Sequence, residues 1–310
     1  MTATDFLTLA DLDRDALLAL LDASAGYKRA RPHGPADWLA GLHVALVMEK
    51  ASTRTRVAFE VAVRELGGHA TLLTVDGSQL ARGEPIADTA RVLDRFCHAI
   101  VYRTSTDDRL HRMADAARAP VINALTDREH PCQIVADLLT VREHKGRLDV
   151  AYAWIGDGNN MAHSWLHAAG ILGLRLTLAC PETHRPDPAI VAAARAAGAT
   201  VELVARPDQA VAGADVVMTD VWASMGQEHE QAARGKAFAG YLVDEALLAG
   251  AAADAIVLHC LPAHRGEEIA AEVIDGPRGR AIWDQAENRL HTHKAILERA
   301  FTGAARGPGR

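Results

Sequence analysis

The sequence predicts an α/β fold built on parallel sheets, and two observations support this class. Short apolar runs alternate with longer stretches of helical periodicity almost to the end of the chain, which is the pattern of βαβ units. The chain has 310 residues, of which 49% are hydrophobic, so it is long enough for roughly two domains with a substantial core in each.

The strands are predicted from the short apolar runs, and the helices from the periodic stretches between them. The predicted strands are Leu42–Val47, Ala70–Leu73, Ala99–Tyr102, Val121–Ile122, Val150–Ile155, Leu174–Ala179, Thr200–Val204, Val216–Met218, Ile256–His259 and Ala281–Ile282. The predicted helices are Val57–Leu66, Ile86–Cys97, Gln133–Lys145, Met161–Leu172, Ala189–Ala197, Glu267–Ile274 and Ala286–Ala300.

A domain boundary is predicted near Gly146. The helix Gln133–Lys145 ends there, at a glycine suited to stop it, and a new series of strands begins after Asp149. The last predicted helix could pack on either domain. The tail from Gly303 to Arg310 is expected to fray.

Charge and cysteine content exclude several classes of protein. The formal net charge is −7 and no long basic run occurs, so nucleic acid is not an expected partner. No apolar run approaches the ~20 residues that span a bilayer, so no membrane partner is expected. The four cysteines are widely spread, and the first ten residues do not resemble a signal peptide, so we expect a cytoplasmic protein with reduced thiols.

The segment Ser52-Thr53-Arg54-Thr55-Arg56 is the most informative motif. It follows the predicted strand Leu42–Val47 and opens the predicted helix Val57–Leu66. The first N–H groups of a helix have no partner within it and lie at the positive end of its dipole, so an anion fits there. Arginine adds planar donors that match phosphate oxygens. The same sequence would also fit an ordinary Ser/Thr N-cap followed by surface arginines, with no anion site.

Polar side chains also follow other predicted strands, where ligands bind in open parallel sheets. They are Arg103, the segment 156–160, Asp220 and Cys260. Asp220 could bind a cationic amine, and the following Ser224-Met225-Gly226 could close over a ligand or be an ordinary loop. Cys260 could be a nucleophile, a hydrogen-bonding group or inert core.

Three further motifs have both a functional and a purely local interpretation. In His130-Pro131-Cys132-Gln133, the histidine and the glutamine could grip a carbamoyl group or satisfy nearby backbone. Gly156-Asp157-Gly158 lacks the third glycine of the dinucleotide motif, which favours a tight turn over NAD binding. Arg289 could cap a ligand carbonyl or form an ion pair, and no metal is expected at His291-x-His293.

The ordered set of motifs resembles the aspartate/ornithine carbamoyltransferase family over nearly the whole chain, with Met48 as one apolar departure. Two elements point to its ornithine branch, Ser224-Met225-Gly226 and His259-Cys260-Leu261-Pro262. The remaining motifs that carry the resemblance are 49–56, Ser78-Gln79, Arg103, 130–133, 157–160, Asp220 and Glu287-Asn288-Arg289.

The resemblance implies two doubly wound parallel-sheet domains and a homotrimer or a multiple of trimers. The carbamoyl phosphate-binding domain would comprise 1–146 with 288–310, and the ornithine-binding domain 147–287. Gln79 would reach the site of a neighbouring subunit. Neither a cofactor nor a metal is implied.

The implied reaction transfers the carbamoyl group of carbamoyl phosphate to the side-chain amine of L-ornithine, giving L-citrulline and phosphate. The implied role is in arginine metabolism, with biosynthesis as the expected direction. Residues implied in carbamoyl phosphate binding are Ser52, Thr53, Arg54, Thr55, Gln79, Arg103, His130, Gln133, Cys260, Leu261 and Arg289. Residues implied in ornithine binding are Asn160, Asp220, Ser224 and Met225. The implied catalytic residues are Arg54, Arg103, His130, Asp220 and Cys260.

Three alternatives remain at this point. The enzyme could act on another amine, such as putrescine, with a changed loop around Ser224. The chain could instead be a nucleotide-binding or regulatory protein that uses the turn at Gly156, or a catalytically silent partner in an oligomer.

Overall fold

A computed structural model describes residues 4–31, 36–223, 231–305 and 307 of the chain. The chain divides into two compact units, which we call unit 1 and unit 2. Unit 1 comprises Met1–Leu139 and Glu287–Arg310, and unit 2 comprises Thr140–Ala286. Each unit is built around its own parallel sheet.

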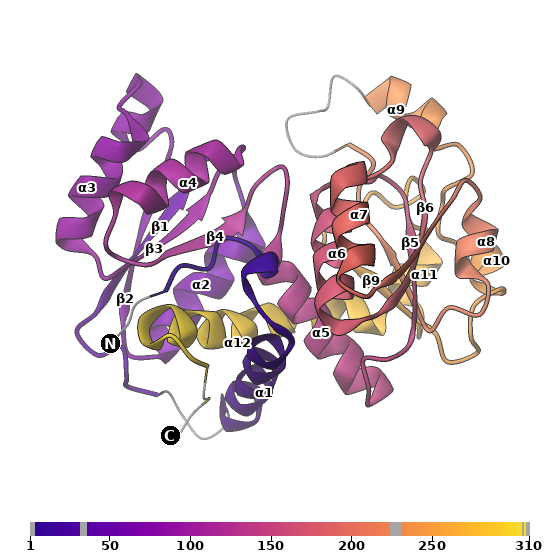
Figure 1. Cartoon of the computed structure of the whole chain (residues 1–310), viewed down its shortest axis with the longest axis horizontal. Helices are drawn as coiled ribbons and strands as arrows, with labels where there is room; N and C mark the ends of the chain where they lie inside the picture. The colour runs from indigo at the N-terminus through magenta and orange to yellow at the C-terminus, as the bar shows by residue number, and fades with distance from the viewer. Residues whose placement is uncertain (1–3, 32–35, 224–230, 306, 308–310) are drawn as a thin grey trace. The chain divides into compact units, whose positions relative to one another are not determined.

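The described residues of unit 1 form a four-stranded parallel sheet in the order β2-β1-β3-β4 (Figure 1). The strands are β1 (His43–Met48), β2 (His69–Thr74), β3 (Ala99–Arg103) and β4 (Val121–Leu125). The helical segments that begin in this part of the chain are η1 (Leu9–Asp11), α1 (Arg14–Ala30), α2 (Thr53–Glu65), η3 (Gln79–Arg82), α3 (Ile86–Phe96), α4 (Asp107–Ala116) and α5 (Pro131–Lys145).

Helices cover both faces of the unit 1 sheet. The side chains of α3 and α4 pack with those of β1 and β3 in one buried cluster that includes Ile86, Leu93, Met113 and Tyr102. Helix α2 contacts β1 and β2, and lies on the opposite face from α3 and α4 (Figure 1). The chain therefore leaves β1 in one direction and later returns to β3 in the other, so the switch point of the sheet lies between β1 and β3.

The described residues of unit 2 form a five-stranded parallel sheet in the order β7-β6-β5-β8-β9. The strands are β5 (Ala151–Ile155), β6 (Arg175–Ala179), β7 (Thr200–Val204), β8 (Val216–Thr219) and β9 (Ile256–His259). The helical segments are α6 (Asn160–Leu172), η4 (Glu182–His184), α7 (Pro188–Ala196), α8 (Pro207–Val211), α9 (Gln231–Ala237), α10 (Glu245–Leu248), α11 (Ala271–Asp275) and α12 (Arg280–Thr302), which continues into unit 1.

The unit 2 sheet is wound in the same way. Helices α6 and α7 pack against each other, while the side chains of α8, α10 and α11 join a separate core cluster with Ile155, Val217 and Val257. The switch point lies between β5 and β8, the two strands that precede the segment 156–160 and Asp220. The predicted α/β class is confirmed in both units.

One predicted strand is wrong, and one predicted helix starts too early. Ala281 and Ile282 do not form a strand but lie in the first turn of α12, where both side chains are buried. A two-residue apolar run cannot distinguish a strand from the buried face of a helix. The predicted helix Glu267–Ile274 begins only at Ala271, because an isolated bridge between Arg265 and Ile269 closes a turn before it.

Helices α1 and α4 are among those that were not predicted, although both begin at a recognisable cap. Asp13 accepts a hydrogen bond from the Ala16 N–H at the start of α1, and Thr106 does the same for the Arg109 N–H in α4. Such caps are ordinary helix-start signals.

A buried histidine in α12 packs against α2 inside unit 1. The His293 ring is stacked on Phe59, with ring centroids 3.7 Å apart. Both ring nitrogens are buried and have no hydrogen-bond partner among the described residues. Burial, with a smaller contribution from Arg289, holds the pKa of His293 well below its ordinary value of 6.5. The ring is therefore neutral and carries two unsatisfied polar atoms.

We expect His293→Leu to stabilise the protein by about 1–2 kcal/mol at pH 7, because an apolar side chain leaves no polar atom unsatisfied. Below pH 6.5 the unfolded chain binds a proton at His293 that the native protein excludes, so the gain should grow as the pH falls. Urea unfolding at a series of pH values measures both effects. The exposed His111→Gln on α4 is the control, and an unchanged stability and pH slope in His293→Leu would contradict the prediction.

Candidate active site

The segment 52–56 in unit 1 lies at the carboxyl end of β1 and begins α2. Ser52 is the N-cap of this helix, and its Oγ accepts a hydrogen bond from the Thr55 N–H at 3.3 Å. Thr53 and Arg54 occupy the first turn, where helical backbone N–H groups have no intrahelical acceptor. The Ser/Thr cap and the anion site are therefore not alternatives, since the capped helix itself presents the N–H groups.

Two arginines from distant parts of the sequence share the hydroxyl groups of this segment. Arg103 Nη1 donates to Ser52 Oγ at 3.1 Å and lies 3.3 Å from Thr55 Oγ1. Arg289, from α12, donates through Nη2 to the same Thr55 Oγ1 at 2.6 Å. Thr55 is fully buried, so two guanidinium groups converge on a hydroxyl that is shielded from water.

A register shift in the sheet accompanies the position of Arg103. The pairing of β3 with β4 is regular up to Tyr102 and shifts between Tyr102 and Arg103, so that Arg103 is paired with Leu125. Bulges of this kind turn a side chain away from the regular pleat and are common beside active sites.

His130 belongs to the same electrostatic environment. Its pKa is well below 6.5, first because it is buried and then because Arg289, Arg103, His293 and Arg54 lie near it. A neutral imidazole has one N–H donor and one acceptor nitrogen, so His130 is able to donate a hydrogen bond without carrying charge. The structure thus brings Arg54, Arg103, His130 and Arg289 together in one place.

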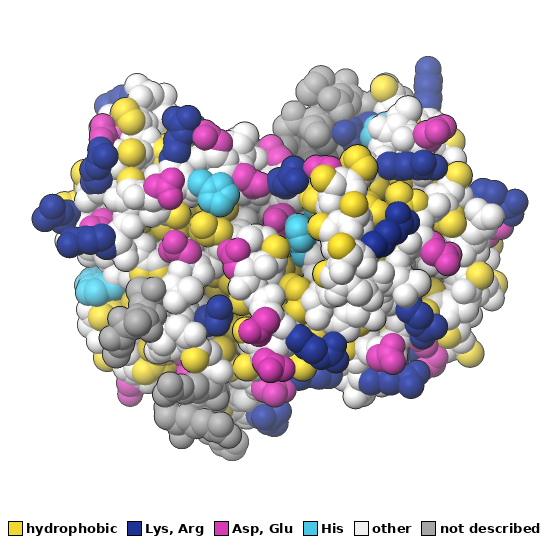
Figure 2. Space-filling model, viewed as in Figure 1, with side chains coloured by type: hydrophobic (Ala, Val, Ile, Leu, Met, Phe, Trp, Pro, Cys, Tyr) yellow, Lys and Arg dark blue, Asp and Glu magenta, His cyan; other side chains and the backbone are white. Residues whose placement is uncertain are grey.

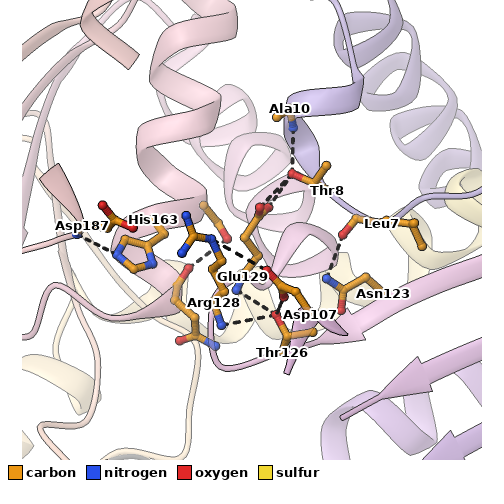
Figure 3. Close-up of polar contacts among 12 residues, drawn as sticks. Leu7, Thr8, Ala10, Asp107, Asn123, Thr126, Arg128, Glu129, His163 and Asp187 are labelled. Carbon is orange, nitrogen blue, oxygen red and sulfur yellow. Dashed lines mark hydrogen bonds and ion pairs between the residues drawn. The ribbon is translucent and has the colours of Figure 1, made fainter. Parts of the chain in front are cut away.

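The loop that precedes His130 is held by a polar network that the sequence did not predict (Figure 3). Thr126 Oγ1 donates to Asp107 Oδ1 at 2.6 Å and accepts from the Glu129 N–H at 3.1 Å. Thr8 Oγ1 lies 2.8 Å from each carboxylate oxygen of Glu129. The backbone on the amino side of His130 is therefore fixed by residues from the amino terminus and from α4.

Gln133 is buried in the first turns of α5. Its Nε2 donates to Asp137 Oδ1 at 2.8 Å, and this carboxylate partner identifies Nε2 as the side of the amide that faces Asp137. The opposite atom, Oε1, is buried and has no partner among the described residues. Gln133 thus offers an acceptor that is ready for a donor such as an NH2 group. Arg54 Nε is likewise a buried donor with no partner in the described part of the chain.

Glu49 lies between β1 and the segment 52–56, and its side chain binds both residues that flank Arg103, namely Tyr102 and Thr104. Its carboxylate accepts from the Tyr102 hydroxyl at 2.5 Å, the Thr104 hydroxyl at 2.7 Å and Arg109 Nε at 3.0 Å. Its backbone N–H donates to the Arg103 carbonyl at 2.9 Å. Burial raises the pKa of Glu49, but the hydrogen bonds from Arg109, Thr104 and Tyr102 outweigh it and lower the pKa. Glu49 is therefore an ionised clamp between β1 and β3.

Unit 2 carries a carboxylate beside a thiol. Cys260 Sγ donates to Asp220 Oδ1 at 3.1 Å, and Asn159 Nδ2 donates to Asp220 Oδ2 at 3.0 Å. Asn159 also caps α6, because its Oδ1 accepts from the N–H groups of Met161 and Ala162. The contact to Asp220 uses the S–H proton, so the thiol form of Cys260 faces the carboxylate.

The glycine turn after β5 is explained by local packing. A Cβ on Gly158 would lie 2.2 Å from the backbone nitrogen of Pro186, so no other residue fits there. Asp157 pairs with Arg234 at 2.6 Å, and both side chains are largely buried. Burial raises the pKa of Asp157, although Arg234 partly offsets it. The glycines thus permit close contact between loops of unit 2.

The strand end after β9 is held by His259. Its Nδ1 accepts from the Leu261 N–H at 2.9 Å, so its Nε2 carries the proton and donates to Glu268 Oε1 at 3.0 Å. Leu261 has a φ of +59°, the left-handed region that non-glycine residues adopt only at a cost of roughly 1–2 kcal/mol. The Leu261–Pro262 peptide bond is cis.

For the other predicted site residues, the described contacts do not indicate a role. Gln79 is exposed on η3, and its only described side-chain contact is with Arg82 Nη1 at 3.5 Å. Asn160 begins α6 directly after Asn159, which lies in the predicted polar segment 156–160 and caps the helix, although no ligand-binding role was predicted for it. Ser224 and Met225 lie outside the described residues.

The fold and these residues define a class of two-domain α/β enzyme. One unit presents guanidinium and hydroxyl groups to an anion at the switch point of its sheet, and the other presents a carboxylate with a thiol at the corresponding place.

Comparison with known proteins identifies the family. Residues 4–143 match the "Aspartate/ornithine carbamoyltransferase, carbamoyl-P binding domain" and residues 148–300 match the "Aspartate/ornithine carbamoyltransferase, Asp/Orn binding domain". The chain belongs to the aspartate/ornithine carbamoyltransferase family and is a carbamoyltransferase, so the resemblance found in the sequence is confirmed.

Individual relatives are similar over most of their length. The ornithine carbamoyltransferase of Acidothermus cellulolyticus is 56% identical over 302 residues, which cover 94% of this chain and 95% of the relative. The structure of ornithine carbamoyltransferase from Pyrococcus furiosus has a TM-score of 0.91 and 42% identity, covering 97% of this chain and 98% of the other. The structure of anabolic ornithine carbamoyltransferase from Campylobacter jejuni has a TM-score of 0.91 and 39% identity, covering 96% and 98%.

In the described part of the chain, no helix combines the length and apolar character needed to cross a bilayer. Figure 2 shows acidic and basic side chains mixed on the visible face of each unit.

The clamp at Glu49 gives a stability prediction. Glu49→Ala should destabilise the protein by about 2 kcal/mol, because Tyr102 loses its acceptor and Arg109 its ion-pair partner. Glu49→Gln keeps one carbonyl acceptor and should cost less. Urea unfolding of the two variants tests this order, and equal stability of Glu49→Ala and the unmodified protein would contradict it.

Proposed function

We propose that this carbamoyltransferase is an ornithine carbamoyltransferase, which converts carbamoyl phosphate and L-ornithine to L-citrulline and phosphate. The observation that carries the proposal is the convergence of Arg103 and Arg289 on the hydroxyl of Thr55 at the start of α2. A doubly charged phosphate with an attached carbamoyl group matches this arrangement of cationic donors and helix N–H groups.

The phosphate end of the substrate is assigned to unit 1. In this proposal Ser52, Thr53, Arg54 and Thr55 bind phosphate oxygens, with help from Arg103. Negative charge grows on the leaving phosphate as the C–O bond breaks, so the same donors stabilise the transition state more than the substrate. The buried Nε of Arg54 is one donor that phosphate would satisfy.

The carbamoyl end is assigned to His130, Gln133 and Arg289, together with Leu261 and Cys260 from unit 2. The carbonyl oxygen gains negative charge when the amine attacks, and Arg103 and neutral His130 are able to donate to it. Gln133 Oε1 is suited to accept from the carbamoyl NH2, as is the carbonyl of Leu261. In this proposal Arg289 also donates a hydrogen bond to the carbonyl oxygen of the substrate.

The amine of ornithine is the nucleophile. It attacks only when neutral, although its pKa in water is close to that of lysine, about 10.4. We assign Asp220 and Cys260 to orient this amine, and the 3.1 Å contact between them supports a joint role. The transfer is direct in this proposal, with Cys260 as an orienting thiol and no acyl-enzyme. Asn160, Ser224 and Met225 are assigned to the amino-acid end.

The functional domains that we propose are those expected from the sequence. We assign carbamoyl phosphate binding to 1–146 with 288–310, and ornithine binding to 147–287. We also propose a homotrimer or a multiple of trimers, with Gln79 reaching the site of a neighbouring subunit. Two exposed apolar side chains on α3 support an association surface in unit 1, since Val92 and Phe96 are 49% and 70% exposed.

The physiological role proposed is arginine biosynthesis in the cytoplasm. The "anabolic" designation of the Campylobacter jejuni relative supports the biosynthetic direction. The reaction transfers a carbamoyl group between two substrates without a change of oxidation state, so we propose that it requires no cofactor.

The purified protein should form citrulline from carbamoyl phosphate and L-ornithine, and putrescine, lysine and aspartate should be much poorer acceptors. A colorimetric assay for the carbamoylated product, run with all four amines under the same conditions, measures this preference. A preference for putrescine would reassign the acceptor, and no product with any amine would reject the activity.

Asp220→Asn should mainly harm the use of ornithine, because the neutral amide cannot attract or orient a cationic amine. We expect a higher KM for ornithine and a lower kcat, with the KM for carbamoyl phosphate nearly unchanged. Steady-state kinetics with each substrate varied in turn measures the three constants. The exposed Asp208→Asn at the start of α8 is the control, and an unaltered response to ornithine in Asp220→Asn would remove Asp220 from this role.

A further inference from the structure

A tight turn in unit 2 places three possible metal ligands within a few residues of one another. The turn spans residues 264–269 and follows the strand end of β9. The Glu267 N–H donates to the His264 carbonyl at 2.9 Å, and the Gly266 N–H donates to the Ile269 carbonyl at 2.9 Å. Gly266 has a φ of +87°, which glycine adopts readily. The backbone that carries the three side chains is therefore fixed.

The ligand atoms of His264, Glu267 and Glu268 all lie within 4.8 Å of one another. The side chains of His264 and Glu267 are 44% and 41% exposed, and the His264 Nδ1 lies 3.6 Å from Glu267 Oε2. Partly exposed side chains of this kind change rotamer on the picosecond to nanosecond timescale, so both can turn toward an ion. Glu268 is fully buried and gives the group a fixed member.

The carboxylate of Glu268 is satisfied on one side only. Its Oε1 accepts from His259 Nε2 at 3.0 Å and from the His264 N–H at 2.7 Å. Its Oε2 is buried and has no hydrogen-bond partner among the described residues. A buried carboxylate oxygen without a partner is costly, and a bound cation would compensate it. This oxygen is an observation independent of the clustering of the three residues.

We propose that His264, Glu267 and Glu268 bind a divalent transition-metal cation, with His264 Nδ1 and one oxygen from each carboxylate as ligands. The oxygen of Glu268 left for the ion is Oε2. One imidazole with two carboxylates suits Zn²⁺, Co²⁺ or Mn²⁺ better than Mg²⁺ or Ca²⁺, which prefer oxygen ligands alone. Water completes the coordination on the exposed side.

A second group in the described residues has comparable spacing, namely Asp220, His259 and Cys260. His259 is a poor ligand there, because Nδ1 accepts from Leu261 and Nε2 donates to Glu268. The thiol of Cys260 is engaged with Asp220 and belongs to the candidate active site. The turn at 264–268 is therefore the better cation site, and it is separate from the residues assigned to the reaction.

Co²⁺ distinguishes the two groups by spectroscopy. The metal-free full-length protein is titrated with Co²⁺, and the visible d–d bands report binding while a thiolate-to-metal charge-transfer band reports a cysteine ligand. We expect d–d bands that saturate at one Co²⁺ per chain, without the charge-transfer band, and displacement of Co²⁺ by Zn²⁺.

Variants locate the site. His264→Asn and Glu267→Gln should each weaken Co²⁺ binding by at least about tenfold, because each removes one ligand. Cys260→Ser and Glu272→Gln should leave binding unchanged, the latter as a matched exposed carboxylate on α11. A charge-transfer band that Cys260→Ser abolishes, or affinity unchanged in both His264→Asn and Glu267→Gln, would overturn the proposal. Neither outcome depends on the carbamoyltransferase reaction, so the proposed function stands or falls separately.

Discussion

The candidate site in unit 1 depends on positive charge that is concentrated at one end of its sheet. Arg103 and Arg289 share the buried hydroxyl of Thr55, while Arg54 extends from the same turn of α2. Guanidinium groups in close proximity repel one another, and the positive end of a helix dipole adds to the charge. The fold maintains this arrangement through hydroxyl contacts and burial. The positive groups are therefore already in place when an anion binds, and the anion relieves their mutual repulsion.

Burial and the same charge together explain the neutral state of His130. A histidine in water would be partly protonated near neutral pH, but burial and the nearby arginines keep this one neutral. Neutral imidazole can donate a hydrogen bond to an oxygen on which charge develops. The network around Thr126 and Glu129 then matters because it fixes the backbone next to His130. The cationic cluster thus determines what unit 1 binds and, together with burial, keeps His130 neutral where it would meet the ligand.

Unit 2 has the opposite polarity at its switch point. Asp220 is held by Asn159 and Cys260, so its two oxygens have defined directions before any ligand arrives. A carboxylate presented in this way suits an amine, as the arginines of unit 1 suit a phosphate. The support beyond these residues is again polar and buried, with His259 bridging the backbone of Leu261 and the carboxylate of Glu268.

The sequence by itself determined the α/β class, most strands of both sheets and the residue types of the site. Strand ends in a parallel sheet converge, so polar residues after β1, β3, β5 and β8 could be assigned to sites before the fold was known. The sequence could not identify the clamp at Glu49, because its partners Tyr102, Thr104 and Arg109 are more than fifty residues away. It also misassigned Ala281–Ile282, where two apolar residues fit either element. The tertiary structure alone decided which hydroxyls the arginines share, which nitrogen of His259 carries its proton and which oxygen of Glu268 has no partner. These features depend on contacts between distant segments and on burial, and no local pattern of residues encodes either one.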